Sequence, residues 1–243
     1  MTKTSTTLLH EVLDAHGGVD RWRQFEGLSS TIVTGGALWG LKGIDMDRSP
    51  RRATTKFREQ WTQVGGFGDP SWTMTWTPAH LEIADGDGKI IAERDNGRDA
   101  FGDRGFDTPW DPLNLAYFNG YAMWTYHAAP FLMAEPGYEV HETNSVDHEG
   151  EVLRGLRVRF PQGIHTHTRE QRFYFGTDLL LRRHDYEVDV WAISPAAHFL
   201  SDYIEVDGLK FPTRRSVYER KPDGSPNYDF NTVTVELSDY TLR

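Results

Sequence analysis

Residues 164–191 read IHTHTREQRFYFGTDLLLRRHDYEVDVW, and this stretch decides the fold. Two runs rich in aromatic and β-branched residues, 164–175 and 179–191, flank the turn-forming triplet at 176–178. A run, a tight turn and a second run predict two antiparallel strands joined by a hairpin.

The same pattern continues on both sides of this hairpin. Further turn sequences occur at 86–89, 148–151, 206–209 and 222–226, each between strand-like runs. In SWTMTW, residues 71–76, apolar side chains alternate with Ser and Thr, as in a strand with one apolar face. Crossover helices are missing from the C-terminal half, which predicts a meander of antiparallel strands. The strands expected there cover 138–143, 151–160, 164–175, 179–191, 197–206, 209–220 and 228–241.

Helical patterns occur at two places. Leu8, Leu9, Val12 and Leu13 share one helical face ahead of a Gly-Gly pair, so we expect N-terminal helices within 6–25. Asp111 and Pro112 provide an N-cap and a first-turn proline for a second helix at 112–129. That helix is apolar almost all round, which predicts that it is buried.

These elements predict one domain over residues 1–243, with the β-meander starting at residue 28. The fold class is mainly β (α+β): a curved antiparallel half-open β-barrel of about ten strands, with an N-terminal helix and a central buried helix. The glycine-rich GGALWGLKG at 35–43 is expected to lead into a strand, so it offers no helix N-terminus to a phosphate group.

The composition of the chain argues against several classes of binding partner. A formal net charge of −10 repels nucleic acid, and the absence of Cys excludes disulfides and thiolate zinc sites. No apolar run reaches the length that spans a bilayer, so membrane insertion is not expected. Glu11 and Asp14 interrupt any N-terminal apolar run, which predicts a cytoplasmic protein without a secretion signal. Nucleotide-binding, serine-hydrolase and zinc-protease motifs are missing, and no cofactor is predicted. The sequence does not indicate the oligomeric state.

Several segments resemble a known group of proteins. AHGGVDRW, GGALWGLKG, YFNGYAMWTY and THTREQRFYF…LLRRHDY…DGLKFPTRR look like bacterial proteins of unassigned activity. Their layout is similar to that of the lipoprotein-carrier (LolA/LolB-like) superfamily. The resemblance implies a half-open antiparallel barrel that wraps around helices and closes an apolar cavity. It carries over no functional residue.

Polar residues gather on the strands of the meander. Strand alternation places His165, His167 and Gln171 on one face of the first strand of the hairpin. On the second strand Arg182, His184 and Tyr186 share one face and Asp185 lies on the other; the next strand aligns His198 with Asp202. If these strands are neighbours, His167 and His198 can approach Asp185 or Tyr186.

Three functions remain open. In the first, a cofactor-independent lyase, isomerase or cyclase uses His167 and His198 as acid and base, Asp185 or Asp202 to orient an imidazole, and Tyr186, Arg182 and Gln171 to hold a substrate oxygen. The second is a non-catalytic carrier or sensor of a lipid or other apolar metabolite. The third is a mononuclear metal enzyme that uses His165 and His167. In each case the partner is a small, largely hydrophobic molecule, and the aromatic residues expected around it are Trp39, Trp72, Trp76, Tyr121 and Trp124.

Overall fold

The computed structural model describes residues 7–45, 48–102, 105, 107–191 and 194–243. Within these residues the chain forms a single antiparallel sheet of thirteen strands. The strands are β1 (Gly27–Gly35), β2 (Arg51–Lys56), β3 (Thr62–Gly65), β4 (Thr73–Trp76), β5 (His80–Ala84), β6 (Ile90–Asp95), β7 (Glu139–His148), β8 (Glu151–Arg159), β9 (Glu170–Phe175), β10 (Leu181–Val188), β11 (Ser194–Val206), β12 (Leu209–Arg220) and β13 (Pro226–Leu242).

The strand order is linear: β6-β5-β4-β3-β2-β1-β13-β12-β11-β10-β9-β8-β7. The first and last strands of the chain join the two halves, because β1 pairs with β13 from Leu28↔Leu242 to Gly35↔Thr234. β6 and β7 are therefore the two edges of one sheet. The predicted open, curved antiparallel sheet is confirmed in outline, but the expected number of about ten strands is wrong because the N-terminal half contributes several strands of only four to six residues.

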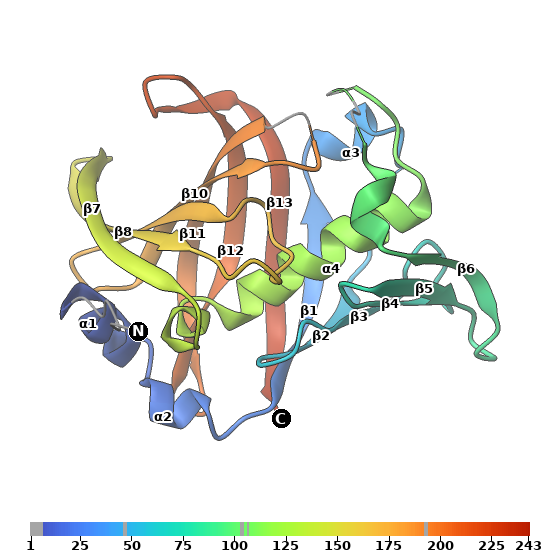
Figure 1. Cartoon of the computed structure of the whole chain (residues 1–243), viewed down its shortest axis with the longest axis horizontal. Helices are drawn as coiled ribbons and strands as arrows, with labels where there is room; N and C mark the ends of the chain where they lie inside the picture. Colours follow the sequence, from blue (N-terminus) through green and yellow to red (C-terminus); the bar gives the residue numbers. More distant parts are fainter. Residues whose placement is uncertain (1–6, 46–47, 103–104, 106, 192–193) are drawn as a thin grey trace.

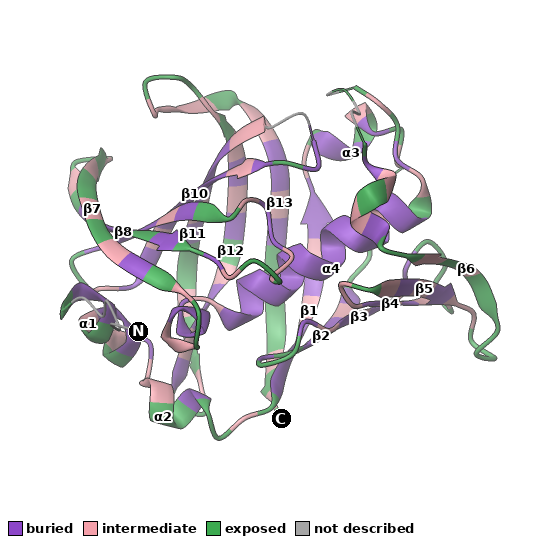
Figure 2. Ribbon diagram, viewed as in Figure 1, coloured by how far each residue is buried: buried purple, intermediate pink, exposed green. Residues whose placement is uncertain are grey.

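Helix α4 (Pro112–Ala128) crosses the inner face of the sheet, in front of β11, β12 and β13 (Figure 1). Its start follows the prediction: the Asp111 carboxylate accepts a hydrogen bond from the Asn114 backbone N–H at 2.8 Å, and the Asn114 amide oxygen accepts one from the Asp111 N–H at 3.3 Å. Nearly every residue after the first turn is buried, and Figure 2 shows the helix in the buried colour along its length.

Helix α4 lies against the half of the sheet that contains β2 to β6, which we call the short-strand wing. Its backbone comes close to β2, β3, β4 and β5. At Gly120 a β-carbon would stand 2.2 Å from Cγ of Trp76, so only glycine permits this approach. The Thr62 hydroxyl also donates a hydrogen bond to the Gly120 carbonyl at 2.8 Å.

The short helices close the ends of the sheet. Helices α1 (Thr7–Ala15) and α2 (Val19–Trp22) lie beside η2 (Phe131–Ala134), where Trp22 stacks on Phe131 with ring centroids 5.6 Å apart. Helix α3 (Leu38–Leu41) corrects the expectation for 35–43: β1 ends at Gly35, and GGALWGLKG turns into this helix rather than into a strand. None of the helices in the described ranges is long and apolar enough to span a membrane.

Candidate functional site

A cluster of histidines and tyrosines fills the space between α4 and strands β9 to β12. Antiparallel register explains the sheet side of the cluster, because His184 of β10 lies directly opposite His198 of β11 and Tyr186 lies opposite Ala196. All four side chains point towards α4 and are buried. We call the following set the histidine–tyrosine layer: His165, His167, His184, His198, Tyr117, Tyr121, Tyr126 and Tyr186.

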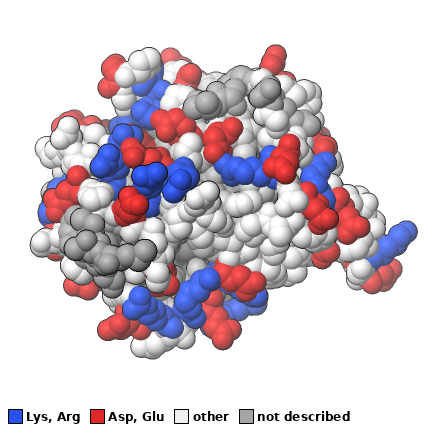
Figure 3. All heavy atoms as spheres, in the orientation of Figure 1, with Lys and Arg blue, Asp and Glu red and all other residues white. Residues whose placement is uncertain are grey.

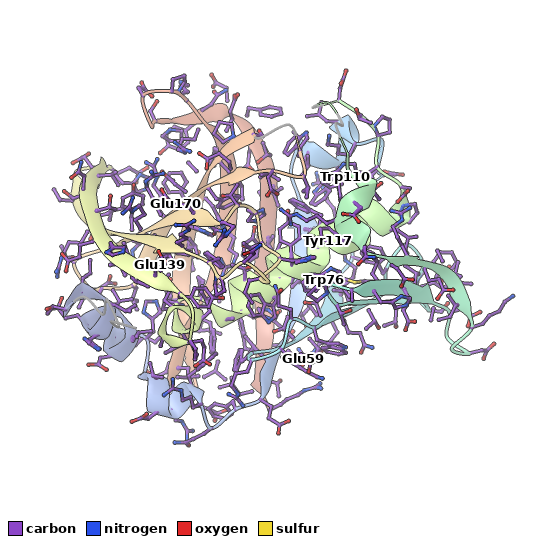
Figure 4. All side chains as sticks on the ribbon, viewed as in Figure 1. Glu59, Trp76, Trp110, Tyr117, Glu139 and Glu170 are labelled. Atoms are coloured by element: carbon purple, nitrogen blue, oxygen red, sulfur yellow. The ribbon has the colours of Figure 1, made fainter. Side chains whose placement is uncertain are left out.

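The helix side of the layer comes from Tyr117, Tyr121 and Tyr126 of α4, of which the first two are spaced four apart. The Tyr117 hydroxyl lies 2.7 Å from Nδ1 of His165, and the Tyr121 hydroxyl lies 3.2 Å from Nδ1 of His167. This spacing places both phenols on one helical face, towards the loop at 161–169 that carries the two histidines. In Figure 4, Tyr117 of α4 and Trp76 of β4 lie close together, and their ring centroids are 6.1 Å apart.

His165 and His167 lie in that loop and not in a strand. The prediction of a strand over 164–175 is wrong in its first half, since β9 begins at Glu170. Long-range hydrogen bonds hold the loop: the Gln60 amide donates to the His165 carbonyl at 2.7 Å and accepts from the His165 N–H at 2.8 Å. Gln171 also donates to the Thr166 hydroxyl and to the Thr168 carbonyl, each at 2.8 Å.

Ring stacking fixes the buried imidazoles. His167 lies flat on Tyr186, with centroids 3.9 Å apart and planes 5° apart, and His184 lies on Phe173 at 4.0 Å. Nε2 of His184 hydrogen-bonds to the Gln171 side-chain oxygen at 2.6 Å. In the part of the chain that the structure describes, Nε2 of His167 and both ring nitrogens of His198 have no hydrogen-bond partner.

Burial keeps these groups uncharged at neutral pH. Desolvation lowers the pKa of His167 to about 3 and lowers the pKa of His184 and of His198 well below the ordinary value. Desolvation likewise raises the pKa of Tyr121 and of Tyr186 well above the usual range. The layer therefore offers neutral imidazoles and phenols, which can donate and accept hydrogen bonds but are not poised to exchange protons near pH 7.

A charged contact closes the layer at the solvent side. Arg98 of η1 (Gly97–Ala100) forms an ion pair with Asp189, which follows β10, and donates to the Tyr117 hydroxyl and the Thr166 carbonyl at 3.3 Å each. Burial raises the pKa of the Asp189 carboxyl, while the arginine opposes that change. This contact joins the short-strand wing to β10 across α4.

A small pocket lies beside the layer, with a volume of about 20 Å³. That space holds about one water molecule, so side chains nearly fill this part of the interior. A larger guest requires side chains or α4 to move. The residues that line this pocket include Leu38, Phe118, Tyr126, Tyr186, Ala196 and Val217.

The structure brings together only part of the predicted site. His167, His198, Tyr186, Gln171 and Tyr121 all belong to or touch the layer.

The predicted carboxylates are elsewhere. Asp185 lies on the opposite face of β10 and pairs with Arg183 at 2.7 Å, and Asp202 is exposed and lies 3.5 Å from Arg214. Asp185 cannot orient an imidazole of the layer, because successive side chains of a strand point to opposite faces. Asp202 cannot either, because its backbone is left-handed, with φ 57°, and the regular alternation of β11 that would align it with His198 ends there. The remaining polar prediction, Arg182, pairs with Asp178 and lies over the Tyr203 ring.

The aromatic residues that were predicted to surround a ligand lie at separate places in the structure. Trp76 is held by Gly120, and the Trp39 and Trp124 indoles donate 2.8 Å hydrogen bonds to the carbonyls of Gly35 and Lys56. Trp72 is half-buried and precedes β4. None of these four lines the small pocket. For the metal hypothesis, the described residues contain no group of three or more metal-ligating side chains around His165 and His167 or elsewhere.

Three residues of the layer had no role in the hypotheses drawn from the sequence: His184, Tyr117 and Tyr126. The strand pattern placed His184 on the same face as Tyr186 but gave it no function. Tyr117 and Tyr126 are two of several aromatic residues on an almost wholly apolar helix, so nothing marked them out. Arg215, which donates to the Tyr126 carbonyl, was not marked out either, because it stands next to an exposed arginine.

Comparison with known proteins identifies the architecture. No protein-family model and no curated protein sequence matches the chain. A solved LolA superfamily protein from Nitrosomonas europaea is 11% identical, with a TM-score of 0.51 over 98% of this chain and 94% of that one. A DUF1329 family protein from Desulfovibrio piger is also 11% identical, with a TM-score of 0.52 over the same shares. A domain from Vibrio parahaemolyticus, named for outer-membrane lipoprotein sorting, is 8% identical, with a TM-score of 0.50 over 94% and 93%.

This chain has the LolA-like fold. The resemblance to the LolA-like group and its curved antiparallel sheet around a buried helix are therefore confirmed, although the sheet is open and not closed into a barrel. Two other predictions are corrected by the same matches. The expected cytoplasmic location is wrong, since the fold is shared with a domain named for sorting at the outer membrane. The expected lyase or isomerase chemistry is wrong as well: that name describes sorting and not catalysis, and the layer lacks the carboxylates that the acid–base scheme required.

Proposed function

We propose that this protein is a non-catalytic carrier of a small hydrophobic or lipid-like molecule, which it holds between α4 and the inner face of β9 to β12. The sharing of the fold with a domain named for lipoprotein sorting supports a carrier. Fold alone does not determine function, so the proposal depends on the interior itself.

The observation that carries the proposal is the asymmetry around α4. On the side of the short-strand wing, the helix backbone is in close contact with the sheet, as at Gly120 and Trp76. On the other side, stacked side chains such as His167 and Tyr186 fill the gap. Side chains can rotate while the backbone stays in place, so this second side is where a guest can be admitted.

The interior favours an apolar guest. Leu38, Phe118, Val188, Trp191 and Val217 line the small pocket beside the layer. Removing an apolar molecule from water into such surroundings is favourable by about 25 cal/mol per Å² of buried surface. Outside, Figure 3 shows acidic and basic side chains interspersed around the face it draws, as expected for a surface that stays in water.

Binding of the neutral fluorescent probe N-phenyl-1-naphthylamine tests the proposal. We expect saturable binding of one probe per chain, and mass spectrometry of a solvent extract of the native protein should reveal a co-purified apolar molecule. The variant Val217→Trp places an indole in the pocket and should weaken probe binding at least tenfold.

The matched control is Val152→Trp, because Val152 is 59% exposed on β8 and far from the pocket lining. This variant should bind the probe as the unchanged protein does. If Val217→Trp does not fold, Ala196→Leu fills the same pocket with a smaller change. Probe binding that is not saturable, or that survives both pocket variants in folded protein, would contradict a carrier of this design.

A further inference from the structure

Two consecutive arginines of β12 have opposite environments. Arg214 points outward, with a side chain that is 62% exposed and lies 3.5 Å from the Asp202 carboxylate. Arg215 points inward, opposite Leu200 of β11 and Val235 of β13, and is 4% exposed. An arginine in such an apolar setting normally has a carboxylate partner, since an isolated charge is costly to bury.

Arg215 has no such partner among the described residues. One Nη donates to the Tyr126 carbonyl at 2.8 Å, the guanidinium lies 4.5 Å from the centroid of the Tyr126 ring, and Nε has no acceptor. The groups that act on its charge are phenols, those of Tyr126, Tyr186, Tyr203 and Tyr240. Burial lowers the pKa of Arg215, yet a guanidinium stays protonated in proteins.

The end of α4 balances this charge only in part. Tyr126 lies in the last turn of α4, where carbonyl groups lack partners within the helix. Such a C-terminus carries about half a negative elementary charge. The remaining positive charge is unopposed, which favours an anion beside Arg215.

Further hydrogen-bonding groups lie close to Arg215. His198 is fully buried with neither ring nitrogen in a hydrogen bond among the described residues, and its ring centroid is 4.8 Å from that of Tyr126. The hydroxyls of Tyr126 and Tyr186 hydrogen-bond to each other. Tyr126, Tyr186 and Val217 line the small pocket. Arg215 and His198 lie directly behind this wall, because Arg215 contacts the Tyr126 ring and His198 contacts the rings of Tyr126 and Tyr186.

We propose that Arg215 and His198 bind the carboxylate of the carried molecule, so that the ligand is a long-chain carboxylate whose tail lies among Phe118, Val188 and Leu38. This inference rests on the proposed carrier function and adds the ligand class. The guanidinium supplies charge and its free Nε–H, the His198 imidazole donates one N–H, and the tyrosine hydroxyls complete the coordination of the two oxygens.

The test compares decanoate with decan-1-ol, which share a chain length, differ in the head group and both dissolve as monomers at the concentrations that calorimetry requires. Isothermal titration calorimetry at pH 8, below the micelle concentration, measures both affinities. In the unchanged protein we expect the acid to bind at least tenfold more tightly than the alcohol. In Arg215→Met the preference should fall to about one, while in the matched control Arg214→Met it should stay as it was.

Each outcome decides a different claim. Equal affinities for acid and alcohol in the unchanged protein would overturn the carboxylate site and leave the carrier function standing. Failure to bind either molecule or the neutral naphthylamine probe would overturn the carrier function itself. If Arg215→Met does not fold, His198→Phe should weaken binding of the acid several-fold and leave binding of the alcohol unchanged.

Discussion

Histidine has two distinct roles in the interior. His127 of α4 is fully satisfied, since its ring nitrogens lie 2.9 Å from the hydroxyls of Ser30 and Thr55. The side chains of His167 and His198 have nitrogens without partners among the described residues. The first histidine ties α4 to β1 and β2, whereas the other two belong to the proposed binding region.

Replacing the satisfied histidine should cost stability. In His127→Leu the two hydroxyls lose their shared partner inside the protein, and each buried unsatisfied group costs about 1–3 kcal/mol. We expect the free energy of unfolding in urea to fall by about 2–4 kcal/mol. His10→Leu on the exposed face of α1 is the control and should change it by about 0.5 kcal/mol at most. Equal effects in both variants would show that the bridge from His127 contributes nothing.

Individual site residues were predictable only where strand alternation applied. The pattern placed Tyr186 and His184 on one face of their strand, and both side chains are buried in the layer. It also separated Asp185 from Tyr186, so the proposed contact between Asp185 and the histidines conflicted with the pattern itself. Arg215 could not be recognised from its neighbours, because the burial of one arginine of a pair depends on which face the distant helix α4 covers.

Single elements were predicted best where local chemistry marks their ends. Helix α4 was expected at 112–129 and covers Pro112–Ala128, because Asp111 and Pro112 specify its start. Residues 164–169 of the loop were mistaken for the start of a strand. The alternating His and Thr residues of this segment imitate a strand, whereas the contacts that hold it come from Gln60 and Gln171. A local pattern contains no information about such partners.

The contact between α4 and the short-strand wing allows a sharp test. Ala is ordinarily better than Gly in a helix by about 1 kcal/mol, but in Gly120→Ala the added carbon would meet Cγ of Trp76 at 2.2 Å. Overpacking of this kind costs about 1–3 kcal/mol, so we expect a net loss in the free energy of unfolding. Gly40→Ala in α3 meets no atom within 4 Å and should be neutral or stabilising. Stabilisation by both changes would mean that the helix is not held closely at Trp76.

On the scale of the whole molecule, the buried histidines make stability depend on pH. Burial lowers the pKa of His16 to about 4 and the pKa of His127 and His167 to about 3. In the unfolded chain each imidazole titrates near pH 6.5, so between these values the unfolded state binds more protons. The associated stability is fully present above pH 6.5 and is lost as the pH falls towards 3–4.

Urea unfolding at pH 7.5 and pH 5.0 measures this dependence. At pH 5.0 each of the three histidines should remove about 2 kcal/mol. The raised pKa values of Asp185 and Asp189 act in the opposite direction, but the histidines outnumber them. In His16→Gln the decrease between the two pH values should be smaller than in the unchanged protein. A free energy of unfolding that is the same at both pH values would contradict the neutral state of the buried imidazoles.

The overall architecture was predictable because hairpin turns are local and recur along the C-terminal half. The number of strands was not, since β3 to β6 are short and are stabilised by α4 rather than by strong strand propensity. The sequence also could not indicate how full the interior is. Side-chain packing between distant elements decides the volume of the pocket beside the layer, which is about 20 Å³.

The close contact between Gly120 and Trp76 determines which part of the molecule moves when a ligand binds. Helix and short-strand wing share close backbone contacts and should stay together as one rigid block. The pairing of β1 with β13 keeps the two halves joined at the back of the sheet. Across the interior, the loop at 161–169 and the end of β10 meet the block through side-chain links, among them Gln60 to His165 and Arg98 to Asp189. Binding of a ligand should therefore loosen the loop around His165. Its amide hydrogens should exchange faster with deuterium when the ligand is present, while those in the middle of α4 keep their protection.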